Sequence, residues 1–162
     1  MEVYVEVRQR GRYFEELDQD AVYVHSPGRT ISEADNTFFS TLTMNPASIH
    51  LDAAESAKTE FGERLVNSLF TLSTLVGLSI PQLTQTTTVA NLGFSRVDFP
   101  RPVFVGDTLY ARTTVIDKRL SKSRPEVGIV VFRHEGYNQR DELVAVAERT
   151  AMMKRLPEDT DD

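Results

Sequence analysis

An apolar stretch without a charged residue lies near the middle of the chain, from Leu65 to Leu78. Its apolar and small residues recur at helical steps in two neighbouring stripes: Leu65, Leu69, Leu72 and Val76, and Val66, Phe70 and Gly77. A helix with no charged face has no side turned to bulk water, so the pattern predicts a helix that is buried nearly all round. Gly77 and Pro81 are expected to end it. The run is shorter than the ~20 residues that a membrane-crossing helix needs.

Helical patterns also precede this stretch. Ser32 is a good N-cap, and the helix that it opens is expected to end near Met44, because Pro46 disfavours a helical conformation at the residue before it. The predicted apolar stripe of this helix consists of Ala34, Phe38 and Leu42, with Phe39 alongside. Asn45 to His50 is then expected to be a loop or an extended bridge, and Asp52 to cap a short second helix.

Strand-like segments dominate the rest of the chain. They are Ala21 to His25, Thr86 to Asp98, Thr108 to Leu120, Val127 to Glu135 and Leu143 to Arg155. Ser26-Pro27-Gly28 is expected to close the first of them with a turn, Gly93 to form a bulge, and Gly106-Asp107 to form a turn.

Helices followed by adjacent strands with short links favour an α+β fold with an antiparallel sheet. A sheet is also the remaining source of cover for the buried helix, and an antiparallel sheet wrapped around a long central helix is the architecture called hotdog. We therefore expect one hotdog domain over residues 1–156. The acidic tail, residues 157–162, is expected to be disordered.

Composition narrows the function. The 162 residues suit one domain with a full core, and the net charge of −6 argues against a general nucleic-acid surface. Because the chain has no cysteine, disulfides and thiolate metal sites are excluded. The three histidines, His25, His50 and His134, have no metal-ligand spacing. With no leader or membrane run, the expectation is a cytoplasmic protein.

His50 is the leading candidate for chemistry. It follows Asn45 by five residues and stands just before a capped helix, and histidine passes protons in either direction near neutrality. Asn45 can hold a water or orient the imidazole, but it cannot act as a base. The alternative is that His50 only fixes its loop with a hydrogen bond.

The start of the apolar helix is the second candidate. Unpaired backbone N–H groups near Asn67 and Ser68 could polarise a thioester carbonyl or stabilise an enolate oxygen. The alternative is that one of the two residues is simply an N-cap. Phe38 and Phe39 could line an acyl pocket or pack in the core. His25 and His134 are expected to be ordinary surface or edge histidines.

Three segments together resemble the MaoC-like, R-specific enoyl-CoA hydratases. TLTMNPASIHLDAAESA is similar to the family's signature, with Asn45 where the family has its catalytic Asp and His50 on the catalytic His. LVNSLFTLS is similar to the start of the hotdog helix and places Ser68 on a Gly whose amide meets the thioester oxygen. FPRPVFVGDTL is similar to the family's strand entry. The likeness covers roughly residues 13 to 155.

The resemblance implies hydration or dehydration of an enoyl-CoA/3-hydroxyacyl-CoA thioester. With Asn45 in place of Asp, one acid/base group is missing. Either His50 makes both proton transfers while Asn45 orients the water, or a carboxylate substitutes, or the protein binds acyl-CoA without turning it over. The candidate carboxylates are Asp35, Asp52 and Glu55. A rival hotdog activity, thioester hydrolysis, would rely on Glu63 as the acid near the helix start.

Asn at position 45 is similar to a branch linked to short branched or dicarboxylic acyl-CoAs of the mesaconyl- or itaconyl-CoA type. An arginine side chain would bind a free carboxylate on the substrate, and the candidates are Arg29, Arg64 and Arg101. The resemblance further implies a homodimer or larger homo-oligomer with the active site at the dimer interface. It implies no metal and no organic cofactor, because coenzyme A is part of the substrate.

Overall fold

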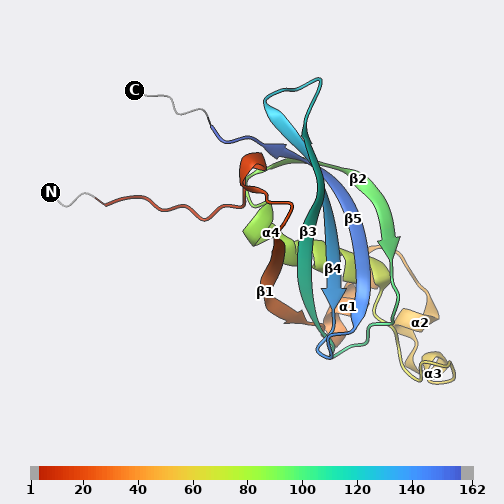
Figure 1. The fold of residues 1–162 in the computed structure, drawn as a ribbon. Helices are drawn as coiled ribbons and strands as arrows, with labels where there is room; N and C mark the ends of the chain where they lie inside the picture. Colours follow the sequence, from red (N-terminus) through yellow and green to blue (C-terminus); the bar gives the residue numbers. More distant parts are fainter. Residues whose placement is uncertain (1–3, 158–162) are drawn as a thin grey trace.

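A five-stranded antiparallel sheet forms the body of the molecule in the computed structural model, which describes residues 4–157. The strand order is β1-β3-β4-β5-β2, and α4 lies across one face of the curved sheet (Figure 1). The strands are β1 (Val22–Thr30), β2 (Thr88–Asp98), β3 (Thr108–Leu120), β4 (Val127–Tyr137) and β5 (Leu143–Lys154). The helices are η1 (Phe14–Glu16), α1 (Glu33–Leu42), α2 (Ser48–Leu51), α3 (Ala53–Ser56) and α4 (Ser68–Leu83). The predicted α+β class with an antiparallel sheet is confirmed.

The sheet follows the alternation of the sequence closely, with one correction at β1. The predicted bulge at Gly93 is present, since its φ is 144° and the register with β5 shifts beside it. The predicted turn at Ser26-Pro27-Gly28 is wrong: β1 continues to Thr30, with a shift of register between His25 and Arg29. Because β1 is an edge strand, Pro27 can stand in it without removing a hydrogen bond from an inner ladder.

The central helix differs from its prediction in length and in burial. It continues through Gly77 and Pro81 to Leu83, which is fully buried. A proline in the last turn removes only one intrahelical hydrogen bond, and the packing of that turn outweighs the loss. The buried face consists of Phe70, Thr71, Leu75, Ser79 and Leu83. The opposite side is not covered, and Leu69 is 57% exposed. The expectation of burial nearly all round is therefore wrong for the single chain.

Helix α1 turns an unexpected face toward the core. Phe38 and Leu42, predicted to form its apolar stripe, are each 68% exposed. Asn36 and Ser40 are fully buried in their place, and Phe39 packs edge-on against Phe70 with 5.5 Å between ring centroids. The inward side of α1 therefore combines two hydrogen-bonding residues with the aromatic contact of Phe39.

The segment between α1 and α4 is more helical than predicted. α1 and its C-cap are followed by a left-handed residue, Met44 (φ 57°). The next residue, Asn45, donates its N–H to the Ser40 carbonyl at 2.9 Å. Residues 48–51 then form the helical turn α2, which corrects the expected loop and places His50 in its last turn. Asp52 caps α3 as predicted, accepting from the N–H groups of Ala54 and Glu55.

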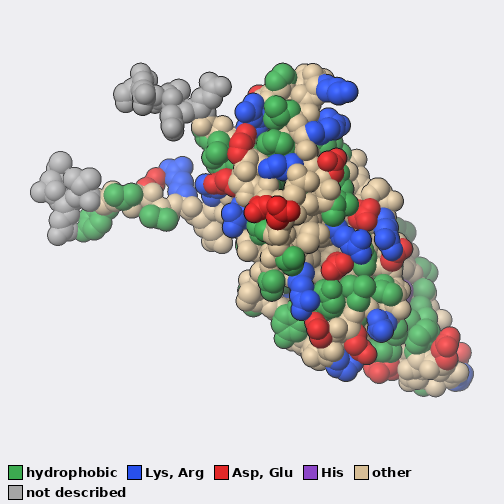
Figure 2. Space-filling view, viewed as in Figure 1, with side chains coloured by type: hydrophobic (Ala, Val, Ile, Leu, Met, Phe, Trp, Pro, Cys, Tyr) green, Lys and Arg blue, Asp and Glu red, His purple; other side chains and the backbone are tan. Residues whose placement is uncertain are grey.

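The chain ends and the surface complete the picture. Residues 4–10 lead away from the body in Figure 1 and have no regular secondary structure. The tail expected to be disordered falls almost entirely on residues 158–162, outside the described residues. Charges of both signs are interspersed over the face shown in Figure 2, with no extended basic area. None of the helices within residues 4–157 has the length and apolar character needed to span a bilayer.

Candidate functional site

His50 is held with one ring nitrogen occupied and the other available. Its Nδ1 lies 3.0 Å from the Leu65 carbonyl oxygen, and the ring is half-buried. Because a carbonyl can only accept, Nδ1 carries the hydrogen in this pair. In the neutral imidazole Nε2 is then unprotonated, which is the form that a general base requires.

The short segment that leads from Leu65 into α4 is fixed on two sides. The Leu65 N–H donates to the Ile49 carbonyl at 2.9 Å, so α2 and this segment exchange hydrogen bonds in both directions. On the other side Leu65 forms an isolated β-bridge with Phe104, and the Val66 N–H donates to the Val103 carbonyl at 2.8 Å. The imidazole therefore stands on a rigid support.

The first turn of α4 presents a free amide. Asn67 is the N-cap, and its Oδ1 accepts from the Leu69 N–H at 3.0 Å. Ser68 is the first residue inside the helix and is exposed, so its N–H has no acceptor in the helix and lies at the positive end of the helix dipole. Asn67 therefore caps the helix, and the Ser68 N–H makes no hydrogen bond to another residue within 4–157.

Two buried polar residues of α1, missed by the sequence reasoning, connect these parts. The Asn36 side-chain amide bonds to the backbone of His50, Leu65 and Asn67. Ser40 Oγ accepts from Asn67 Nδ2 at 3.2 Å. The only signal in the sequence was the recurrence of two polar residues at an i, i+4 spacing, which is typical of an exposed face.

Asn45 and Phe38 lie outside this hydrogen-bonded group. Asn45 Oδ1 accepts from the Ala47 N–H at 3.1 Å, which leaves the side-chain NH₂ as the polar group that can face a ligand. Within residues 4–157 no hydrogen bond joins the side chains of Asn45 and His50. Phe38, predicted to bind substrate, is an exposed residue on the outer side of α1.

A small cavity opens beside the start of α4. Its volume is about 240 Å³, and Leu65, Ser68 and Arg101 line it together with apolar residues that include Phe61 and Phe99. Arg101 donates from Nη1 to the Leu143 carbonyl at 3.3 Å and forms no ion pair with any described carboxylate. Arg29 and Arg64 differ, because they pair with Asp35 and Glu33.

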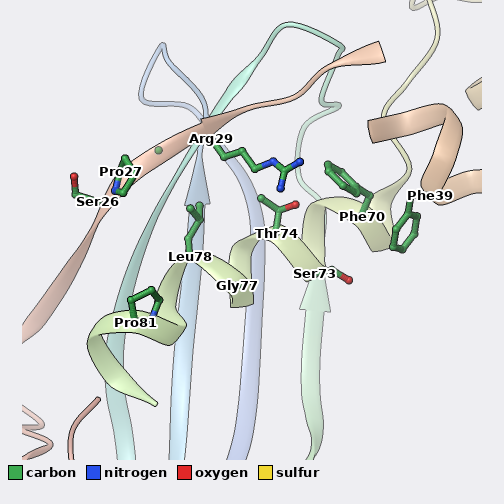
Figure 3. Close-up of a pocket in the computed structure, with 11 residues that line it drawn as sticks. Ser26, Pro27, Arg29, Phe39, Phe70, Ser73, Thr74, Gly77, Leu78 and Pro81 are labelled. Atoms are coloured by element: carbon green, nitrogen blue, oxygen red, sulfur yellow. The ribbon is translucent and has the colours of Figure 1, made fainter. Parts of the chain in front are cut away.

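A larger cavity of about 560 Å³ lies on the other flank of α4, toward β1. Phe39, Phe70, Leu78 and Pro81 are among its apolar residues, and Figure 3 shows Arg29 extending over Thr74 toward the Phe70 ring. It contains no carboxylate or histidine, so it offers shape and apolar surface but no acid/base group.

The carboxylates that could replace the missing Asp are engaged elsewhere. Hydrogen bonds from Ser32, followed by the charge and hydrogen bond of Arg29, lower the pKa of Asp35. Asp52 caps α3, and Glu55 pairs with Lys58 at 2.6 Å. Glu63, the acid expected for thioester hydrolysis, is exposed five residues before α4 begins. Each therefore has a structural role or faces solvent.

The other two histidines are buried, which corrects the expectation of surface or edge residues. His25 Nδ1 lies 2.7 Å from Gln82 Oε1, and Thr113 Oγ1 bridges His25 Nε2 (2.7 Å) to His134 Nδ1 (2.8 Å). Burial, reinforced by the nearby Arg149 and His25, lowers the pKa of His134 to about 3. Their positions on β1 and β4 were predicted, but their inward direction depends on what covers the sheet.

A sheet around one long helix defines a hotdog domain. In this domain a backbone amide and an imidazole lie near the start of the helix. The model of the MaoC-like domain family matches residues 16–136, and the chain belongs to this family. It is 29% identical over 160 residues to the mesaconyl-CoA hydratase of Haloarcula hispanica, covering 96% of this chain and 44% of that protein. The chain thus spans less than half the length of this curated relative.

Solved structures support the fold. An R-hydratase of Pseudomonas aeruginosa superposes with a TM-score of 0.71 at 25% identity, covering 89% of this chain and 86% of that one. A Mycobacterium tuberculosis protein described as a double hotdog superposes with a TM-score of 0.83 at 28% identity. That match covers 94% of this chain and 47% of the other, so the chain corresponds to one of two hotdog units.

Proposed function

We propose that the protein adds water to the double bond of an enoyl-CoA thioester, or removes water from the 3-hydroxyacyl-CoA product, with His50 as the acid and base. The observation that supports this most directly is the His50 Nδ1 bond to the Leu65 carbonyl, which leaves Nε2 unprotonated in the neutral ring and ties the imidazole to a residue three positions before Ser68, the first residue of α4. The family and the name of the relative favour the same reaction.

The proton transfers balance on one imidazole. Nε2 takes a proton from water as the oxygen bonds to C3, and the π electrons move toward the thioester carbonyl. The Ser68 N–H stabilises the resulting enolate oxygen, where preorganised donors contribute most. The imidazolium then returns its proton to C2. A charged imidazole that donates what it has just accepted needs no second carboxylate.

Asn45 takes the role of a water-orienting residue in this proposal. Its Oδ1 is occupied by the Ala47 N–H, so its NH₂ would donate to the water oxygen while that water donates to His50. Because an amide cannot accept the proton, His50 makes both proton transfers. We expect hydration to be slower than at a site with two acid/base groups.

The proposed substrate carries a second, free carboxylate, as a mesaconyl group does. Arg101 is the candidate that would receive it, because it lines the cavity beside Ser68 and forms no ion pair with a carboxylate among residues 4–157. A guanidinium offers planar donors that suit a carboxylate. Arg29 and Arg64 are less suitable because each already pairs with an acid.

We also propose that the active form contains a second hotdog unit, supplied by another copy of this chain. One of the two edge strands of the sheet, β2, carries exposed apolar residues that pairing would cover: Val89, Leu92, Phe94 and Val97. An exposed apolar edge strand is a site for pairing with another sheet. Light scattering on the purified chain tests this, and a monomer at micromolar concentration would contradict it.

Loss of enoyl-thioester absorbance tests the reaction, with crotonyl-, mesaconyl- and itaconyl-CoA as substrates. We expect His50→Gln to lower the rate about 10²- to 10⁴-fold, the range for a general acid–base residue. Arg101→Gln should lower kcat/KM for mesaconyl-CoA but not for crotonyl-CoA, while the control Arg64→Gln should change neither ratio. Release of free CoA without hydration would instead support thioester hydrolysis. An unchanged rate in His50→Gln would remove His50 from the mechanism.

A further inference from the structure

Asn36 makes three hydrogen bonds from its buried side-chain amide to the backbone of the candidate site. Its Nδ2 donates to the His50 carbonyl at 3.2 Å and to the Leu65 carbonyl at 3.1 Å. Its Oδ1 accepts from the Asn67 N–H at 2.9 Å. The side chain is fully buried, so water cannot replace any of these bonds without a rearrangement.

The three partners belong to the two halves of the proposed chemistry. The Leu65 carbonyl that accepts from Asn36 also accepts from His50 Nδ1 and thereby fixes the ring. Asn67 immediately precedes Ser68, whose amide would meet the thioester oxygen. One side chain thus sets the position of the imidazole relative to the helix amide.

We propose that Asn36 is a positioning residue that aligns His50 Nε2 with the Ser68 N–H; this inference rests on the proposed function. Asn36 touches no substrate and transfers no proton. It acts by holding the backbone at His50, Leu65 and Asn67 in one arrangement. A misplacement of about 1 Å between reacting groups can lower the rate about 100-fold. The rate preserved by correct alignment therefore offsets the free-energy cost of burying the Asn36 amide.

Ser40 does not provide the same link. Its Oγ accepts from the side chain of the cap residue Asn67, and its carbonyl accepts from the Asn45 N–H and the Thr43 hydroxyl. No bond from Ser40 reaches the backbone of His50 or Leu65. Asn36 is therefore the residue of α1 through which His50 and the start of α4 are joined.

Two variants of Asn36 test the proposal. Asn36→Asp keeps an acceptor for the Asn67 N–H but places a carboxylate oxygen against the carbonyl oxygens of His50 and Leu65. We expect kcat for hydration to fall about 100-fold with KM changed less than about threefold. Asn36→Ser introduces one hydroxyl and no buried charge, and it should lower kcat about tenfold. This second variant keeps the test possible if Asn36→Asp does not fold.

Thr113→Val is the matched control. Thr113 is also buried and makes two side-chain hydrogen bonds, but these join His25 and His134, away from the candidate site. The substitution should lower the stability by a comparable amount while kcat of the folded protein stays within about twofold. Equal losses of kcat in Thr113→Val and the Asn36 variants would overturn the proposal, because the effect would then follow from stability alone.

A second measurement is independent of turnover. The ¹⁵N shifts of the His50 ring report which nitrogen carries the hydrogen, and we expect a fixed Nδ1–H form in the parent chain. Asn36→Ser should give a mixture of the two forms, whereas Thr113→Val should not. If the parent hydrates none of the substrates, the proposed function fails, and this measurement still decides the positioning role. An unchanged His50 signal in Asn36→Ser, with unchanged kcat where there is turnover, would overturn it.

Discussion

His134 should make the stability of this protein fall as the pH falls below about 6.5, the ordinary pKa of histidine. The ring is fully buried on β4, with Thr113 Oγ1 at Nδ1 and no partner at Nε2 among the described residues. Arg149 and His25 lie near it, and together with burial they lower its pKa to about 3. A proton on this ring would add charge where neighbouring groups are already positive or neutral.

The sign follows from proton binding in the two states. In the unfolded chain His134 titrates at the ordinary histidine pKa of 6.5, whereas in the folded chain its pKa is lowered to about 3. Between these values only the unfolded state binds the proton, so the free energy of unfolding decreases by about 1.4 kcal/mol per pH unit well below pH 6.5. From pH 7.5 to pH 5.0 the contribution of His134 amounts to about 2 kcal/mol. The pKa of His25 is also lowered, chiefly by burial, and acts in the same direction.

Urea unfolding at pH 7.5, 6.5, 5.5 and 5.0, at one protein concentration, measures this dependence. The perturbation is His134→Gln, which removes the titrating ring and keeps polar atoms for Thr113. We expect the parent to lose about 2 kcal/mol more than the variant between pH 7.5 and pH 5.0. Equal pH dependence in the two proteins would refute the reasoning, because His134 would then titrate normally in the folded state.

Three further substitutions test particular contacts. Met44→Gly should raise the stability by about 0.5–1 kcal/mol and Tm by about 1–4 °C in a thermal scan, because the left-handed φ of 57° is costly for a residue with a Cβ; a lower Tm would contradict this. Asn45→Asp keeps the acceptor for the Ala47 N–H and adds a base, so the hydration rate should rise about tenfold or more, and a lower rate would exclude a two-base site. Ser68→Pro deletes the amide hydrogen at a position where helices tolerate proline and should lower kcat about 10²- to 10³-fold, whereas Ser68→Ala should not.

Local rules were enough for the N-caps of α1 and α3 and for the strands other than the end of β1. The alternation from Thr108 to Leu120 predicted β3 with its observed bounds, and Ser32 and Asp52 cap the helices that they were expected to cap. These features depend on neighbours within a few residues, so the sequence contains the information directly. The uncharged helix and the strands that follow it then indicated the hotdog fold, and the resemblance of three separate segments agreed with it.

The sequence named candidate site residues but not the contacts between them. His50, Asn67 and Ser68 were identified from their neighbours in the sequence, and the structure joins them through Leu65 and Asn36. The role of Asn45 is a proposal that Asn45→Asp tests, whereas Phe38 lies on the exposed side of α1. The direction of Arg101 into the cavity beside Ser68 could not be read from its position before a proline.

Burial is what the tertiary structure alone decided. A polar residue at helical spacing, such as Asn36, is normally exposed, and a histidine at a strand position, such as His134, has two possible faces. Both are fully buried because distant segments supply their hydrogen-bond partners, 14 to 31 residues away for Asn36 and 21 for His134. The sequence determines which elements can form, whereas the packing of those elements determines which polar groups have partners and can therefore turn inward.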